Sequence, residues 1–327
     1  MKSIITILLI LVIAICQVNA ENWKETFANR QIITSEMIQK AGLIWLGDIF
    51  MLAEDWDVIT LDGITWQSSP SGLSSFQHQK WIILLDGQVM DIDVFGTRNL
   101  NRLPLSPSRI DYIEFVTIPQ IHEGEFADGG LIHIHTLKPG TGLSISSQMI
   151  TGSETGDPGP YRYTEFRSPN IDRFGHNFST DFSYGDDKMY VQAGLWGGWR
   201  YPTDPDLSRR YFSYFNGDYS KLKHIAPSFK IGKDFHNGKH ELFMGCSWFE
   251  DLFFLKPFGR EIPVESHFLH TGTRGNFNLN DKTNMIYRIT YSENQLVEQE
   301  NLHNTGFDWR MRNMKAEIGA NGLFSSC

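Results

Sequence analysis

Hydrophobic and polar residues follow two different patterns on either side of Pro139. Before it, residues 82–85 are continuously apolar, which is typical of a strand covered on both faces. After it, many short runs alternate apolar with polar residues at a period of two, which indicates strands with two unlike faces. The pattern therefore predicts a mixed α/β region over residues 21–139 and a β region over residues 140–327.

One short helix and one longer helix are expected at the start of the first region. Thr34 or Ser35 can cap a helix over residues 36–41, and Gly42 suits the position just after a helix end. Residues 44–53 carry apolar residues at helical spacing, which predicts a second helix.

Three strands with distinctive ends lie between residues 80 and 139. The first, residues 81–85, ends in an Asp-Gly pair, whose glycine tolerates the positive φ of a strand-reversing turn. The second covers residues 109–116. The third, residues 131–136, follows a Gly-Gly pair that can adopt backbone conformations blocked by a Cβ. The residues that mark these strands are Asp86, Gly87, Arg109, Glu114, Gly129 and Gly130.

The alternation of the second region is clearest at residues 178–184, 285–292 and 307–312. Runs of this length, apolar on one face and polar on the other, are typical of outer-membrane barrel strands. A soluble β-sandwich alternates in the same way, so the period alone leaves both architectures open. Two polar insertions, residues 151–175 and 197–210, are expected to form loops.

Aromatic residues gather around the expected strand ends between residues 196 and 219. Because aromatic girdles flank the apolar band of outer-membrane barrels, we interpret Trp196 and Trp199 as girdle residues and favour a barrel over a sandwich. A sugar-stacking platform over residues 196–201 is the other interpretation of this cluster.

The order of the three marked strands resembles the plug domain of TonB-dependent outer-membrane receptors. In that family, a strand ending in Leu-Asp-Gly precedes a strand with Arg, Ile and Glu, and a Gly-Gly step then leads into a strand ending in Thr. The resemblance covers nearly all of residues 21–139. It implies an α+β plug domain followed by antiparallel transmembrane β-barrel strands, in a receptor of the cell outer membrane. It also implies uptake of a scarce nutrient such as an iron–siderophore complex, cobalamin or a glycan.

The barrel is expected to be incomplete. Barrels that surround a plug have about 22 strands of about 10 residues, whereas only about 190 residues follow Pro139. These residues provide for roughly eight to eleven strands, and a closed barrel of about eight strands is filled by its own side chains.

The resemblance further implies substrate contacts in the apical plug loops and a TonB partner. By position, the loops are residues 64–79 and 88–102, and the candidate substrate contacts are Trp66, His78 and Arg98. An N-terminal box pairs with TonB in the family, but residues 25–33 match such a box poorly. Outer-membrane lipid and a small-molecule or metal-chelate ligand are the other implied partners.

Residues 1–20 have the features of a secretory signal peptide, with Lys2 before a short apolar core and Val-Asn-Ala before Glu21. A lipid anchor on Cys16 is disfavoured, because Ile15 stands where a small residue is required. The net charge of -9 argues against nucleic acid as a partner, since phosphate binding needs clustered Lys and Arg.

Candidate chemistry is sparse. His133 and His135 share one face of a strand and could reach one metal ion, but no further ligand has recognisable spacing, so no metal site and no cofactor are predicted. Asp91 and Asp93 could form a carboxylate pair for glycoside hydrolysis, although a solvated turn explains them. No catalytic motif is present, and a non-enzyme is predicted. The alternatives are a soluble plug-like domain fused to a carbohydrate-binding β-sandwich, and a secreted hydrolase.

Overall fold

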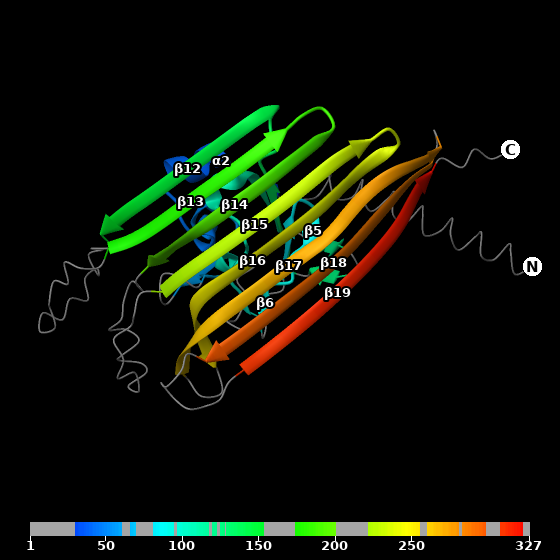
Figure 1. Ribbon diagram of the computed structural model, residues 1–327. Helices are drawn as coiled ribbons and strands as arrows, with labels where there is room; N and C mark the ends of the chain where they lie inside the picture. Colours follow the sequence, from blue (N-terminus) through cyan, green and yellow to red (C-terminus); the bar gives the residue numbers. More distant parts are fainter. Residues whose placement is uncertain are drawn as a thin grey trace, which may run out of the picture.

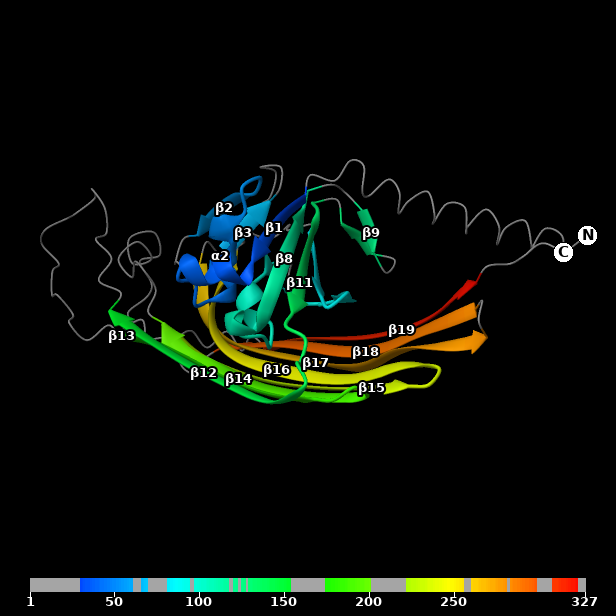
Figure 2. The same cartoon turned by 90° about the horizontal axis from the view of Figure 1, so that it is seen from above.

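The structure is a computed structural model, and it describes residues 30–60, 66–69, 81–94, 97–117, 120–122, 125–127, 129–153, 174–200, 222–255, 260–280, 283–298 and 308–322. Within these ranges, eight long antiparallel strands form one curved sheet (Figure 1). The residues that precede this sheet form a smaller α/β unit, which packs against its concave face (Figure 2). The expected signal peptide, most of the expected TonB box and His78 lie outside the described residues.

A five-stranded sheet is the centre of the α/β unit. All its neighbouring strands are antiparallel except β11 and β4, which are parallel. A core of fully buried aliphatic and aromatic side chains, including Trp81 and Phe115, covers this sheet. In sheet order, the strands are β1 (Arg30–Thr34), β8 (Ile110–Val116), β11 (Leu131–Thr136), β4 (Ile82–Leu85) and β5 (Gln88–Val89).

Both helices of the sequence analysis have structural counterparts, but only one is an α-helix. The helix α2 (Ser35–Lys40) is capped by Thr34, whose hydroxyl accepts a hydrogen bond from the Met37 amide at 3.3 Å. The prediction of a regular helix over residues 44–53 was wrong. The segment is the 3₁₀ helix η1 (Leu46–Leu52), which is buried over the five consecutive residues 46–50.

Short elements replace the expected loop over residues 88–102. This segment holds β5, the hairpin of β6 (Asp93–Val94) with β7 (Thr97–Arg98), and the 3₁₀ helix η2 (Leu100–Arg102). The remaining elements of the unit are β2 (Asp57–Thr60) paired with β3 (Trp66–Ser69), β9 (Gln120–His122) paired with β10 (Glu125–Ala127), and η3 (Pro107–Arg109).

The expected turn after the first marked strand is present between β4 and β5. Asp86 has φ +50° and Gly87 has φ +78°, so both central residues of the hairpin lie in the left-handed region. This conformation matches the twist of the flanking strands and is favoured by Asp-Gly pairs. Gly130, in the expected Gly-Gly step, also has a positive φ, of +101°.

The curved sheet is a simple antiparallel meander with two open edges, β12 and β19. Its strand β14 continues through Arg200, so the loop expected from residue 197 onward begins later than predicted. The strands are β12 (Gly142–Ser153), β13 (Phe174–Gly185), β14 (Met189–Arg200), β15 (Leu222–Phe235), β16 (Gly238–Leu255), β17 (Arg260–Asn280), β18 (Thr283–Glu298) and β19 (Asp308–Gly322).

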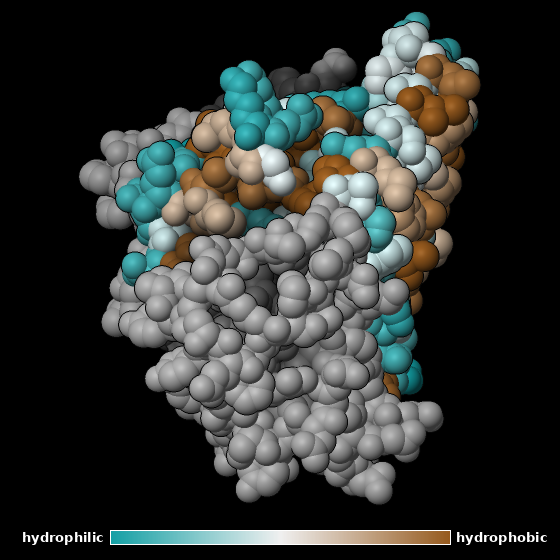
Figure 3. All heavy atoms as spheres, turned by 90° about the vertical axis from the view of Figure 1, so that its left-hand side faces the viewer, coloured by the Kyte–Doolittle hydropathy of each residue, from teal (hydrophilic) through white to brown (hydrophobic). Residues whose placement is uncertain are grey.

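The two faces of the curved sheet differ in polarity, as the alternation predicted. On β13, Phe178, Phe182 and Tyr184 face outward and are 36–40% exposed, whereas Ser179 faces the α/β unit and is 4% exposed. Figure 3 shows hydrophobic side chains along its right-hand margin, where the outer face is seen in profile. Further exposed apolar residues of the sheet are Leu143, Ile145, Met149, Leu195, Ile225, Leu242, Met244, Ile289, Met314 and Ile318.

Charged pairs replace the apolar residues of the outer face toward one end of the strands. Glu293 on β18 accepts from Arg312 on β19 at 3.0 Å and lies 3.3 Å from Arg310 of the same strand. These residues lie toward the ends that residues 201–221 and 299–307 connect. At the other ends, only two or three residues separate consecutive strands, namely residues 186–188, 236–237 and 281–282. We call the latter the hairpin end of the sheet.

Trp196 contradicts the girdle interpretation. It faces inward, is 1% exposed, and its indole nitrogen donates to Asn177 at 3.0 Å. Its ring packs edge-on against Trp45 of the α/β unit, with centroids 5.9 Å apart. The position therefore serves the contact between the two parts of the molecule rather than the outer face. Among the described residues, none lies in a helix that is long and apolar enough to cross a membrane.

Candidate functional site

The α/β unit is held to the curved sheet by buried polar contacts. Arg109, 9% exposed, donates to the Ser228 hydroxyl at 2.8 Å and lies 3.5 Å from Asp181. Burial lowers the pKa of the Arg109 guanidinium, while the charge of Asp181 opposes this shift. Ser108 donates to Asp181 at 3.1 Å, so this carboxylate has partners on two successive residues of the unit.

Glycines of the sheet allow the close approach that these contacts need. A Cβ on Gly194 would lie 2.7 Å from the Asp181 carboxylate and 2.9 Å from the Arg109 guanidinium. A Cβ on Gly245 would lie 2.5 Å from the ring of Pro104. The concave face of the curved sheet is therefore complementary in shape to the surface of the α/β unit.

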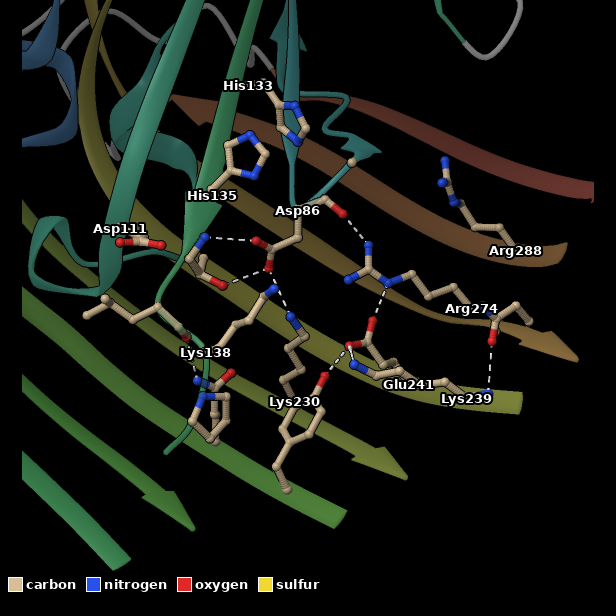
Figure 4. A pocket seen from close by; sticks show the side chains of 18 of the residues that line it. Asp86, Asp111, His133, His135, Lys138, Lys230, Lys239, Glu241, Arg274 and Arg288 are labelled. Atoms are coloured by element: carbon tan, nitrogen blue, oxygen red, sulfur yellow. Dashed lines mark hydrogen bonds and ion pairs between the residues drawn. The ribbon is translucent and has the colours of Figure 1, made fainter. Parts of the chain in front are cut away.

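Asp86, in the β4–β5 turn, is the centre of a second polar contact, near the hairpin end (Figure 4). Its carboxylate accepts from the Thr136 amide at 2.8 Å and the Thr136 hydroxyl at 2.7 Å, and pairs with Lys230 of β15 at 2.9 Å. Burial opposes ionisation of Asp86, but the charge of Lys230 and the Thr136 hydrogen bonds outweigh it. Together they lower the pKa of Asp86 to about 2. The turn thus joins two strands of the unit to the sheet.

Arg274 extends this network across the sheet. Its guanidinium donates to the backbone oxygen of Asp86 and to the carboxylate of Glu241. Glu241 also accepts from Tyr190 and lies 3.6 Å from Lys239. Charged groups of both signs therefore lie side by side from β15 to β17 beneath the α/β unit, and Tyr190 of β14 adds a hydrogen bond.

An open cleft of about 620 Å³ lies beside this network, between the α/β unit and the sheet. Charged side chains from both parts line it, with those of β8 and β11 on one wall and those of β15 to β18 on the other (Figure 4). Its basic residues are Lys138, Lys230, Lys239, Arg274 and Arg288. This charge favours passage or binding of a polar, partly anionic molecule.

Two histidines, His133 and His135, lie on the wall of the cleft, and Glu114 lies beside them. His133 stands directly opposite Glu114 in the β11–β8 ladder, and His135 stands opposite Tyr112. The nitrogen and oxygen donor atoms of Glu114, His133 and His135 all lie within 4.8 Å of one another. Burial lowers the pKa of His135, although Glu114 opposes this shift. His133 and His135 were recognised as a pair from their spacing, whereas Glu114 was missed because only the register of β8 against β11 places it beside them.

The candidate substrate contacts lie apart from the cleft. The Trp66 indole donates to Asp48 at 3.0 Å, and Arg98 pairs with Asp93 at 3.1 Å. Near Arg98, Val94 packs on Val264 and Leu296 of the sheet, close to the ends opposite the hairpins. Trp66 and Arg98 remain predicted contacts, and His78 lies outside the described residues.

The two aspartates considered for hydrolysis have different partners. Asp91 accepts from the Asn313 side-chain amide of β19, whereas Asp93 pairs with Arg98. Each carboxylate thus has a structural partner of its own.

Comparison with solved structures relates this arrangement to known proteins. The siderophore receptor PirA from Acinetobacter baumannii matches 92% of this chain with a TM-score of 0.65, at 12% identity. A mutant of the ferric enterobactin receptor PfeA from Pseudomonas aeruginosa matches 91% with a TM-score of 0.66, also at 12% identity. The ferric-catecholate import receptor Fiu from E. coli K12 matches 90% with a TM-score of 0.53, at 10% identity.

The chain has the fold of TonB-dependent receptors. The α/β unit corresponds to their plug and the curved sheet to part of their barrel. The chain spans about half the length of these receptors, 46% of PirA and 47% of PfeA. No protein-family model and no curated protein matches the chain.

The expected fold class, a plug followed by an incomplete antiparallel barrel, is therefore confirmed. The rival β-sandwich is not formed by the described strands, because the inner face of the sheet packs on the plug.

Proposed function

We propose that this protein is an outer-membrane TonB-dependent receptor that takes up an iron–siderophore complex or another scarce nutrient such as cobalamin or a glycan. In this proposal, residues 1–20 are a signal peptide, residues 21–139 are the plug domain and residues 140–327 are part of the barrel. The neighbours that match the fold include siderophore receptors, one of them in complex with enterobactin.

The observation that carries the proposal is the opposite polarity of the two faces of the sheet. The inner face holds the plug through Asp86, Arg109 and other polar contacts, while the outer face exposes apolar side chains. A large exposed apolar surface is unfavourable in water and favourable in a bilayer. Strands of 12 to 21 residues exceed the length of about 9–11 residues that crosses a bilayer. The charged pairs on the outer face then lie beyond the apolar core of the bilayer.

The lengths of the connections between strands indicate how the proposed barrel is oriented in the outer membrane. Outer-membrane barrels have short periplasmic turns and longer extracellular loops. The hairpin end of the sheet then faces the periplasm, and the cleft beside Asp86 lies at the periplasmic exit. Trp66 and Arg98 lie in plug elements that approach the extracellular ends, where they are proposed to contact the arriving substrate.

Cell fractionation combined with a growth assay tests this function. We expect the protein in the outer membrane, and we expect its deletion to slow growth under iron limitation when one ferric siderophore is the iron source. A parallel assay with cobalamin or glycan as the limiting nutrient distinguishes the substrate classes. Recovery of the protein in the soluble periplasm would contradict the proposal and favour the soluble binding module.

A further inference from the structure

We propose that Glu114, His133 and His135 form a binding site for a divalent transition-metal ion in the plug. The site goes beyond the proposed transport function, because it requires only the fold of the plug. A failure of nutrient uptake would leave it standing, and its own failure would leave the uptake proposal untouched.

The backbone fixes the three ligands in place. His133 and His135 project from the same face of β11, since side chains two residues apart in a strand point the same way. Glu114 projects from the same face of β8, directly opposite His133. Because β11 pairs with β8 and β4, and β8 pairs with β1 and β11, all three ligands stand on strands that are hydrogen-bonded on both sides.

The distances between the donor atoms are short enough for side-chain rotations to close the site around an ion. The donor atoms lie within 4.8 Å of one another, and His135 Nε2 is already 3.3 Å from Glu114 Oε1. With bonds of about 2.0–2.2 Å, the ligands of a tetrahedral ion lie about 3.3–3.6 Å apart. The imidazole centroids of His133 and His135 are 3.7 Å apart, with 37° between the ring planes, so the rings must rotate apart for both nitrogens to point at one ion.

The position of the site leaves a fourth ligand available. His133 and His135 line the cleft, which gives water or another ligand access to the ion. Three protein ligands with one open position are typical of zinc sites that bind an exchangeable ligand. Two imidazoles and one carboxylate select Zn²⁺, Cu²⁺ or Ni²⁺ over Mg²⁺ and Ca²⁺, which prefer oxygen ligands.

Two neighbours modulate the site. Arg30 of β1 forms an ion pair with Glu114 and competes with the ion for this carboxylate. The Arg30 side chain is 47% exposed, so it can turn toward solvent when an ion binds. Tyr112 stacks on His135 with ring centroids 4.1 Å apart and fixes the orientation of this imidazole.

Isothermal titration of the full-length protein with Zn²⁺ tests the site. The protein is purified in detergent without a polyhistidine tag, because a tag binds the same ions. We expect one high-affinity Zn²⁺ per chain. Loss of even an outer-shell partner weakens metal sites about 10–100-fold, so H133N, H135N and E114Q should each weaken binding at least about tenfold.

Two further variants distinguish Zn²⁺ binding at this site from Zn²⁺ binding elsewhere on the protein. Arg30→Gln removes the competing cation and should tighten Zn²⁺ binding by up to about fivefold, the limit for an exposed ion pair. His267→Asn alters a histidine of the outer sheet face that lies 3.7 Å from Glu265, and should leave binding unchanged. Zn²⁺ binding that survives all three ligand substitutions, or that is lost in His267→Asn, would overturn the proposal.

Spectroscopy keeps the test decisive if a ligand variant folds poorly. Electron paramagnetic resonance of the wild-type protein with one equivalent of Cu²⁺ should show two coordinated imidazole nitrogens. Coordination by no imidazole or by a single imidazole, or the absence of any stoichiometric site, would overturn the proposal.

Discussion

Replacing Asp86 tests how strongly the plug is joined to the sheet. The Asp86 carboxylate has a pKa lowered from 3.8 to about 2 by Lys230 and Thr136, against the effect of burial. A shift of nearly two pKa units corresponds to about 2.5 kcal/mol of folding free energy. Both side chains of the pair are at most 20% exposed, so solvent screening reduces this figure little. We therefore expect Asp86→Asn to lower the free energy of unfolding by about 2–3 kcal/mol at neutral pH.

The pH dependence of this effect has a defined sign. Because the pKa of Asp86 is lower in the folded protein than in the unfolded chain, its contribution is complete above about pH 4. The contribution is lost as the pH falls from about 4 to about 2. The difference in stability between wild type and Asp86→Asn should therefore shrink over this range.

Urea unfolding in detergent micelles, followed by tryptophan fluorescence, measures the effect. A double-mutant cycle with Lys230→Met isolates the pair from the Thr136 hydrogen bonds, and we expect a coupling energy of about 1–2 kcal/mol. Asp111→Asn is the matched control, since this carboxylate is exposed on β8, and it should change stability by less than about 0.5 kcal/mol. A loss below 0.5 kcal/mol for Asp86→Asn, or additive effects in the cycle, would refute the reasoning.

Three other substitutions test the plug–sheet interface and the outer face. The two at the interface are measured by the same unfolding assay, and the one on the outer face is measured by insertion into lipid vesicles. Gly245→Ala drives a Cβ into a proline of the plug and should cost about 1–3 kcal/mol, whereas Gly319→Ala, with nothing within 4 Å of its Cβ, should be neutral. Trp196→Ala empties a buried aromatic contact and should cost about 3–5 kcal/mol; a cost below 1 kcal/mol would place this ring outside the interface. Ile289→Arg puts a charge on the apolar outer face and should disfavour insertion into lipid vesicles by about 2–4 kcal/mol, whereas Gln295→Arg, near the charged pairs, should cost about 0–1 kcal/mol. Equal insertion of both variants would contradict a lipid-facing role for Ile289.

Local signals in the sequence predicted much of the fold. The alternation at residues 178–184 identified both faces of β13, because a strand places successive side chains on opposite sides regardless of its partners. The turn at Asp86 was predictable for a similar reason, since the positive φ of an Asp-Gly turn is a property of the residues themselves. The order of the three marked strands between residues 80 and 139 then suggested the plug domain of TonB-dependent receptors.

Features that depend on register or packing could not be read from the sequence. Trp196 is aromatic and near a strand end, and only the position of Trp45 on the plug shows that it faces inward. Glu114 lies far from His133 in sequence, and the ladder between β8 and β11 brings them together. The 3₁₀ form of η1 was missed because its apolar spacing suits both kinds of helix.

A nitroxide scan of β13 over residues 177–184 tests the central claim most directly, in a background that carries Cys246→Ser and Cys327→Ser and is reconstituted in lipid vesicles. If the outer face contacts lipid and the inner face contacts the plug, labels at the outward positions should be relaxed strongly by oxygen dissolved in the bilayer. These positions are Phe178, Thr180, Phe182 and Tyr184. Labels at the alternate positions should be protected. Relaxation of the outward labels by a water-soluble nickel chelate instead, or the absence of a period of two, would contradict a sheet that faces lipid.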